Sequence, residues 1–106
     1  STSASVSAET ILFILQQAKT DRSVTQITLT GLRFCASDTK AILKSIASLL
    51  HLHDRDWKSV TLVLGHAAKS SNSEDQAKWR SIMMESMESF STLYMQTGIP
   101  IDIRPC

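Results

Sequence analysis

A chain of 106 residues is long enough for one domain with one modest hydrophobic core, and 42% hydrophobic with 20% charged residues is typical of a soluble globular protein. The net charge of +1 lacks the basic excess of a nucleic-acid binder, and no apolar run is long enough to cross a bilayer. We therefore expect one domain over residues 7–106 after a disordered lead-in over 1–6, with no nucleic-acid partner, no membrane insertion and no cofactor.

The two cysteines argue against a covalent or metal-bound framework. Cys35 and Cys106 stand 71 positions apart, which is neither a disulfide pattern nor a metal-knuckle spacing. We expect two free thiols, with Cys35 buried and Cys106 exposed, in the reducing environment of the cytoplasm.

The chain begins with a predicted helix over 8–19. Ser7 is a suitable N-cap for it, and Glu9 lies in the first turn, where the helix dipole favours a negative charge. Apolar residues recur at helical spacing: Ile11, Leu12, Leu15 and Ala18. Because Phe13 and Ile14 widen this stripe, we expect the helix to be covered on more than one side.

A strand and a second helix follow. Residues 23–32 are rich in β-branched side chains, which predicts a strand of about six residues closed by Gly31. The stretch 33–50 restarts a helix, with Ser37 or Asp38 as its N-cap. Its apolar face consists of Ile42, Leu43, Ile46, Leu49 and Leu50.

The second half of the chain repeats this order. Residues 57–65 predict a strand closed by Gly65, and its centre is apolar on both faces, as in a buried parallel strand. Ser73 and Gln76 form a capping box that opens the third helix, and Gly98 ends it. One broad stripe on that helix is predicted to be mainly core: Trp79, Ile82, Met83, Met87, Phe90, Leu93 and Tyr94.

The last predicted element is a strand over 99–105, which Pro100 and Pro105 confine to an edge or terminal position. Strands that alternate with helices of this length indicate βαβ units with right-handed crossovers. The sequence therefore predicts an α/β fold: a small three-stranded, mainly parallel sheet in the repeat-like order αβαβαβ. A sheet of this size leaves room for a face that something outside the chain covers.

Two strand segments share an L-x-x-L-x-L-like spacing 33 positions apart: Val24, Ile27 and Leu29 in the first, and Trp57, Val60 and Leu62 in the second. This pattern resembles the ribonuclease-inhibitor-like form of the leucine-rich repeat family over residues 8–65. Leu32 and Gly65 stand where that family carries Asn or Cys. The resemblance implies a curved stack of alternating strands and helices.

A second resemblance rests on the stretch ITLTGLRFCASDTKAIL, which is similar to the central strand and following helix of the STAS domain. Aligned on Phe34, the sequence places Ser37 and Asp38 on the two serine positions of the family's phosphorylated turn. Ala36 replaces the family's Asp, and Thr39 replaces its Gly. The resemblance implies a regulatory domain with Ser37 or Thr39 as the candidate phosphosite.

The segment that joins the second helix to the second strand concentrates His51, His53, Asp54 and Asp56. A hydrolytic metal site needs ligands that converge on one ion, and only His66 remains as a further histidine. Histidines near a helix C-terminus also interact favourably with its dipole. We favour a structural loop and keep a metal site formed by His51, His53 and Asp56, in a small metal-dependent enzyme, as the alternative.

No motif predicts catalysis. The chain has no G-x-S-x-G elbow, and its three glycines are isolated rather than gathered into a phosphate-binding loop. Cys35 is placed at a strand-to-helix turn, where a Cys–His pair is an alternative to a small buried residue. The favoured function is a non-catalytic protein-interaction module. Its candidate partner contacts are Thr25, Thr28, Thr30 and Met84.

Overall fold

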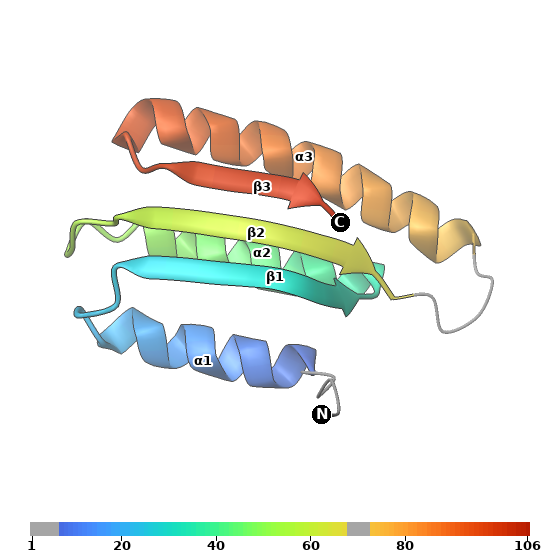
Figure 1. The fold of residues 1–106 in the computed structure, drawn as a ribbon, viewed down its shortest axis with the longest axis horizontal. Coiled ribbons are helices and arrows are strands. Elements are labelled where there is room, and N and C mark those ends of the chain that lie inside the picture. The colour runs from blue at the N-terminus through green and yellow to red at the C-terminus, as the bar shows by residue number, and fades with distance from the viewer. Residues whose placement is uncertain (1–6, 68–72) are drawn as a thin grey trace.

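Helices and strands alternate along the chain in the computed structural model, which describes residues 7–67 and 73–106. The elements are α1 (Ala8–Thr20), β1 (Gln26–Phe34), α2 (Ala36–Leu50), β2 (Ser59–His66), α3 (Ser73–Thr97) and β3 (Ile101–Pro105). The strands form one parallel sheet in the order β1-β2-β3 (Figure 1). The predicted α/β class is confirmed. The expected lead-in over 1–6 lies outside the described residues.

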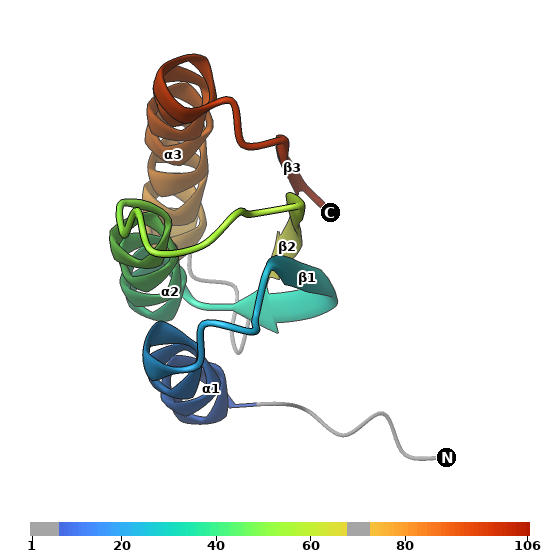
Figure 2. The same cartoon turned by 90° about the vertical axis from the view of Figure 1, so that its left-hand side faces the viewer.

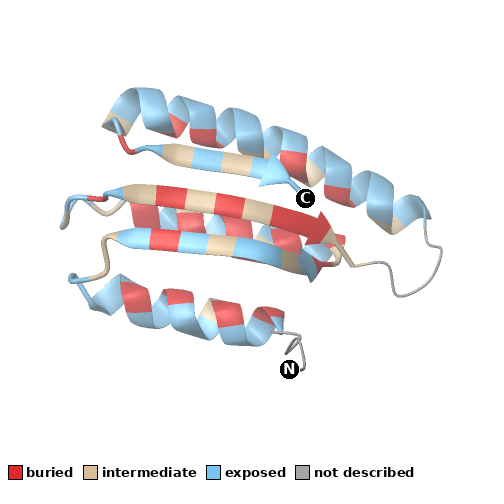
Figure 3. Cartoon of the chain, in the orientation of Figure 1, coloured by how far each residue is buried: buried red, intermediate tan, exposed pale blue. Residues whose placement is uncertain are grey.

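The three helices form one layer and the sheet forms the other, as Figure 2 shows. Strand side chains that point toward the helices are apolar. Strand β2 buries Val60, Leu62 and Leu64, and the residues paired with them on the neighbouring strands point to the same side of the sheet. Ile27 and Leu29 of β1 pair with Val60 and Leu62, at the spacing of 33 positions seen in the sequence. The core therefore lies between the two layers, with β2 at its centre (Figure 3).

Helix α1 begins as predicted, since Ser7 is its N-cap and the Ser7 hydroxyl accepts a hydrogen bond from the Thr10 N–H at 3.3 Å. Ile11, Leu15 and Ala18 are buried. The expectation that α1 is covered on more than one side is wrong: Phe13 is 64% exposed and Ile14 is 54% exposed. A helix in a two-layer domain buries one stripe only, and both residues lie outside it.

Strand β1 is longer than predicted, because Gly31 does not end it. The register with β2 shifts between Thr30 and Leu32, and Gly31 has φ +74°, so the glycine forms a β-bulge and the strand continues to Phe34. Helix α2 then starts at Ala36 with Cys35 at the N-cap position. The prediction of Ser37 or Asp38 as N-cap is therefore wrong: the N-cap position lies two to three residues earlier, directly after the extended strand.

Helix α3 packs its buried residues, Trp79, Met83, Phe90 and Leu93, against the sheet and α2. The predicted stripe is broader than the buried one, since Met87 is 38% exposed and Tyr94 is 51% exposed. Ser73 is the first residue of the helix itself. Gly98 ends α3 as predicted: it has φ +75°, and its N–H donates to the Tyr94 carbonyl at 2.7 Å.

Candidate functional site

The face of the sheet that points away from the helices is polar and is left open by the described elements (Figure 2). Parallel pairing arranges its side chains in rows across the strands. One row is Thr28, Thr61 and Asp102, and the next is Thr30, Val63 and Arg104. Since strand side chains alternate between faces, these residues project opposite to the core residues beside them. We call these six residues the open face.

The far end of the open face is covered by an arginine. A Cβ atom built on Gly65 would lie 3.0 Å from Cγ of Arg33 and 3.4 Å from Cβ of Cys106. The missing side chain of Gly65 therefore leaves the space over β2 into which Arg33 extends. Along the strands, the row of Thr28, Thr61 and Asp102 is thus followed by the row of Thr30, Val63 and Arg104, and Arg33 lies beyond the second row.

The four predicted partner contacts do not share one surface. Thr28 and Thr30 are exposed on the open face. Thr25 precedes β1, is half-buried, and accepts a hydrogen bond from the Lys58 N–H through its carbonyl at 2.7 Å. Met84 is 72% exposed but belongs to α3, in the helix layer behind the sheet. Two threonines are thus brought together, and Met84 lies apart from them.

The two candidate phosphosites differ in accessibility. Ser37 is exposed in the first turn of α2, where its hydroxyl lies 3.4 Å from the Cys35 sulfur. Thr39 is 0% exposed, and its hydroxyl has no hydrogen-bond partner among the described residues. Burial removes Thr39 as a phosphosite of the folded chain, because a kinase needs access to the hydroxyl. Ser37 stays a prediction.

The buried Thr39 hydroxyl makes a stability prediction. We expect Thr39→Val, which keeps the shape and removes the unpaired polar atom, to raise the free energy of unfolding by about 1 kcal/mol. Chemical unfolding followed by circular dichroism measures the change. Thr92→Val is the matched control, because the exposed Thr92 hydroxyl donates to the Glu88 carbonyl at 3.2 Å. A clear loss of stability in Thr39→Val would contradict the conclusion that the buried Thr39 hydroxyl has no hydrogen-bond partner among the described residues.

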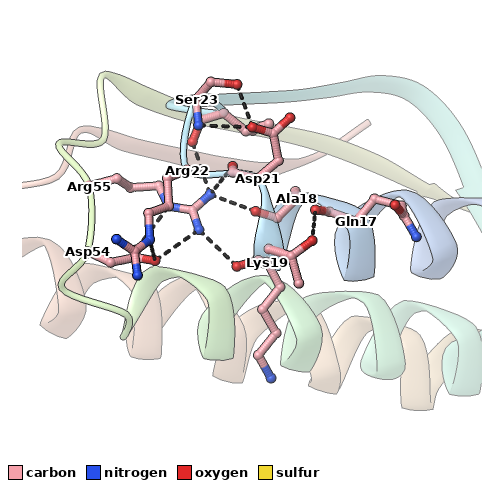
Figure 4. A network of polar contacts seen from close by, with 10 residues as sticks. Gln17, Ala18, Lys19, Asp21, Arg22, Ser23, Asp54 and Arg55 are labelled. Carbon is pink, nitrogen blue, oxygen red and sulfur yellow. Dashed lines mark hydrogen bonds and ion pairs between the residues drawn. The ribbon is translucent and has the colours of Figure 1, made fainter.

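The histidine- and aspartate-rich loop is organised by an arginine. The Arg55 side chain is only 2% exposed and donates hydrogen bonds to four backbone carbonyls (Figure 4). The acceptors belong to the end of α1 and the turn after it: Ala18, Lys19, Asp21 and Val24, at 2.6–3.2 Å. Its guanidinium also lies 5.2 Å from the ring centre of Trp57. The loop thereby ties α1 to the entry of β2.

Asp54 completes this network. Its carboxylate accepts hydrogen bonds from Arg55 at 3.0 and 3.3 Å and lies 3.5 Å from the exposed Arg22. The hydrogen bond from Arg55 holds the pKa of Asp54 below its ordinary value of 3.8. The carboxylate is therefore ionised at neutral pH and balances the charge of the buried guanidinium.

The candidate metal ligands are spread along this loop. His51 is the exposed C-cap of α2, and His53 and Asp56 border a shallow groove of about 420 Å³ that Gln96 and Thr97 close from the α3 side. Within residues 7–67 and 73–106, no three side chains of His, Cys, Asp or Glu gather closely enough to hold a metal ion. The contacts that the structure gives this loop are those of Arg55 and Asp54, and the structural role of the loop stays a prediction.

A second polar cluster, which the sequence analysis missed, lies at the carboxyl end of the sheet. His66, the last residue of β2, has its Nε2 atom 2.6 Å from Asp75 Oδ2 in the first turn of α3. The same carboxylate oxygen accepts a hydrogen bond from the Ala36 N–H at 3.2 Å. Asp75 thus supplies the cap of α2 that the Cys35 side chain does not provide.

The sequence positions of His66 and Asp75 could have predicted this cluster, since His66 ends a strand and Asp75 lies in the first turn of the next helix. Polar residues at the carboxyl ends of parallel strands and in the first turns of the following helices meet at one edge of an α/β sheet. The hydrogen bond from His66 is the main cause that holds the pKa of Asp75 below 3.8, and the Ala36 N–H adds to it. The His66 ring lies 5.8 Å from that of Trp79, which packs the pair against α3.

The lowered pKa of Asp75 gives a pH dependence. A carboxyl whose pKa is lower in the folded than in the unfolded chain stabilises the fold above about 3.8, and this contribution is lost as the pH falls through the folded value. As the pH is lowered below about 3.8, we expect the free energy of unfolding of the unsubstituted chain to fall more steeply than that of Asp75→Asn. Urea unfolding at stepped pH values measures it. Equal slopes would contradict the role of Asp75.

Both cysteines are free, as predicted; Cys106 is exposed, and Cys35 is half-buried rather than fully buried. Among the described residues, no helix combines the length and the apolar character needed to span a bilayer. Comparisons of the chain with models of protein families, with curated proteins and with solved structures found no match. The structural class of the chain therefore comes from its fold: an α/β domain whose parallel sheet is covered by helices on one side only among the described elements.

Proposed function

We propose that this chain is a non-catalytic protein-interaction module of leucine-rich-repeat-like type, which binds a protein partner through the open face. The observation that carries the proposal is the one-sided sheet: three helices cover one face, and the opposite face presents rows of hydroxyl and charged side chains. Folding alone gives no reason to leave a parallel sheet open on one side, since such sheets are ordinarily covered on both.

Three further features support this proposal. The strands follow one another in sequence order, the helices share one face, and β1 and β2 pair at the 33-residue spacing of the repeated segments. These are the properties expected of stacked strand–helix units.

The non-catalytic part of the proposal is supported by the contacts of the polar clusters. Arg55 joins α1 to β2, and Asp75 joins α2 to α3, so both clusters have structural tasks.

The mixed polarity of the open face indicates the chemistry of the partner. Thr28, Thr30 and Thr61 offer hydroxyl groups that both donate and accept hydrogen bonds. Arg104 and Asp102 lie 3.5 Å apart and are exposed, so each is available to a partner side chain of opposite charge. A polar, largely uncharged partner surface with an acidic group toward the Arg33 end fits this arrangement.

Site-specific photo-crosslinking tests the proposal. A benzoylphenylalanine placed at Thr28 should give an adduct of defined mass with a protein from extracts of the source cells, and Thr61→Arg on the neighbouring strand should abolish it. The same crosslinker at Ser48, an exposed position of α2, is the matched control. Identical adducts from both positions, or none from Thr28, would overturn the proposal.

One observation favours the STAS-like regulatory alternative. Ser37 is exposed in the first turn of α2, where the helix dipole stabilises the negative charge of a phosphate. Under this proposal, phosphorylation of Ser37 changes partner binding, whereas Ser45→Asp in the middle of the same helix does not reproduce the effect. Partner binding by Ser37→Asp that matches the natural chain, together with no phosphate at Ser37 in cells, would contradict it.

A further inference from the structure

An apolar groove lies at the β1 end of the sheet, where it borders the open face and shares Thr28 with it. It has a volume of about 630 Å³ and is lined by one side of α1 and by the first half of β1. Its apolar lining residues are Ile11, Ile14, Leu15, Ala18, Val24, Ile27 and Leu29. Both views show α1 lying beyond the free edge of β1, so the helix forms the floor on which one more strand would rest.

The free edge of β1 has hydrogen-bonding groups to offer. The Thr25 carbonyl accepts its hydrogen bond from Lys58, on the β2 side. Because the backbone groups of successive strand residues point to alternate sides, those of Gln26, Thr28 and Thr30 point to the free edge. No described strand pairs with them.

The two edges of the sheet are protected very differently. Strand β3, the other edge, is short and combines Asp102, Arg104 and Pro105, which are features that block further pairing. The first five residues of β1, Gln26–Thr30, contain neither charge nor proline. Only the bulge at Gly31 interrupts this edge, and it limits the pairing stretch to those five residues. An unprotected edge in a chain that protects its other edge indicates a partner at β1.

Charge is confined to one end of the groove. Asp21 is the only ionisable residue of its lining, and a hydrogen bond from the Ser23 hydroxyl holds the pKa of Asp21 below 3.8. The carboxylate is therefore negative at neutral pH, beside the start of β1. The remaining lining is apolar or uncharged. An occupant that matches it has a Lys or Arg at the end next to Asp21 and apolar side chains along its length.

We propose that the groove receives an extended segment of a protein partner, which adds a strand to the free edge of β1. Alternate side chains of this segment rest on Ile11, Ile14 and Leu15 of α1, and a basic residue pairs with Asp21. A second copy of the chain fits less well. Pairing through its own β1 would bring its α1 into the space that α1 already fills, because the helix extends past the strand edge.

A synthetic probe tests the proposal on the full chain. The probe is a labelled peptide of about seven residues, the usual length of a strand, in which threonine and valine alternate after a lysine. We expect saturable binding by fluorescence anisotropy and slower hydrogen exchange at the amides of Gln26, Thr28 and Thr30. The same peptide with N-methyl groups on alternate backbone nitrogens should not bind, since it cannot pair with a strand edge.

Two adjacent residues of α1 supply matched variants. Ile14→Glu introduces a charge into the groove and should weaken peptide binding about tenfold or more. Phe13→Glu, at a position of similar exposure that does not line the groove, should leave the dissociation constant within about twofold. Asp21→Asn should weaken binding of the lysine peptide and not that of a peptide with glutamine in its place.

Several results would overturn the proposal. One is a peptide that fails to bind, that binds without protecting the β1 amides, or that responds equally to Ile14→Glu and Phe13→Glu. Another is concentration-dependent dimerisation that Ile14→Glu alone abolishes, which would make a second copy the occupant. A third is binding that requires removal of residues 1–6, which would make that segment of the chain the occupant.

Discussion

Arg55→Ala is expected to destabilise the fold by about 3–4 kcal/mol, a large part of the stability of a small domain. The substitution leaves four carbonyls in the end of α1 and the turn after it without their donor, and those of Ala18 and Val24 are partly buried. It also removes the guanidinium that lies over Trp57, which contributes about 1 kcal/mol of that total. Urea unfolding followed by circular dichroism measures the loss.

Two control variants separate the geometry of Arg55 from its charge. Arg55→Lys keeps the positive charge, but one ammonium group cannot reach four carbonyls, so we expect most of the destabilisation to remain. Arg22→Ala removes the other cation near Asp54. Because the Arg22 side chain is exposed, we expect a change below about 0.5 kcal/mol. A value for Arg55→Ala as small as that of Arg22→Ala would show that the loop does not hold α1.

The second large effect is expected at the centre of the sheet. Leu62 of β2 is fully buried between the sheet and the helices, and Leu62→Ala should cost about 3–4 kcal/mol through lost burial and the cavity left behind. Its neighbour Val63 points to the open face and is only half-buried. Val63→Ala should therefore cost about 1 kcal/mol or less.

The pair Leu62 and Val63 is a direct test of the one-sided sheet, since the two residues are adjacent in sequence and differ in the face that they occupy. Thermal and chemical unfolding of both variants give the comparison. Similar losses of stability in the two variants would mean that the second face is also covered in solution, and this would remove the basis for an open binding surface.

Much of the core was predictable from the pattern of apolar residues. Helical spacing in α2 identified Ile42, Ile46 and Leu49, and the continuous apolar run of β2 indicated a buried parallel strand. Such patterns succeed because each element contacts the core through a face that repeats with its own period. The prediction failed where local patterns ended, as at Gly31, which looked like a strand terminus and instead allows a bulge.

The polar sites were less predictable because their partners are distant in sequence. Arg55 bonds to carbonyls 31–37 positions earlier in the chain, and backbone carbonyls leave no mark in a sequence. His66 and Asp75 are nine positions apart and belong to different elements. Only the packing of α3 beside α2 makes one carboxylate serve both the imidazole of His66 and the start of α2.

The sequence by itself determined the alternating elements, the αβαβαβ order and most of the buried residues, because these depend on periodicity, capping and turn preferences over short distances. The tertiary structure decided that all helices lie on one face, that α1 extends beyond β1, and that Arg55 rather than the histidines organises the loop. The physical reason is that layer arrangement and hydrogen-bond partners depend on contacts between distant segments, which a local pattern of hydrophobicity does not encode.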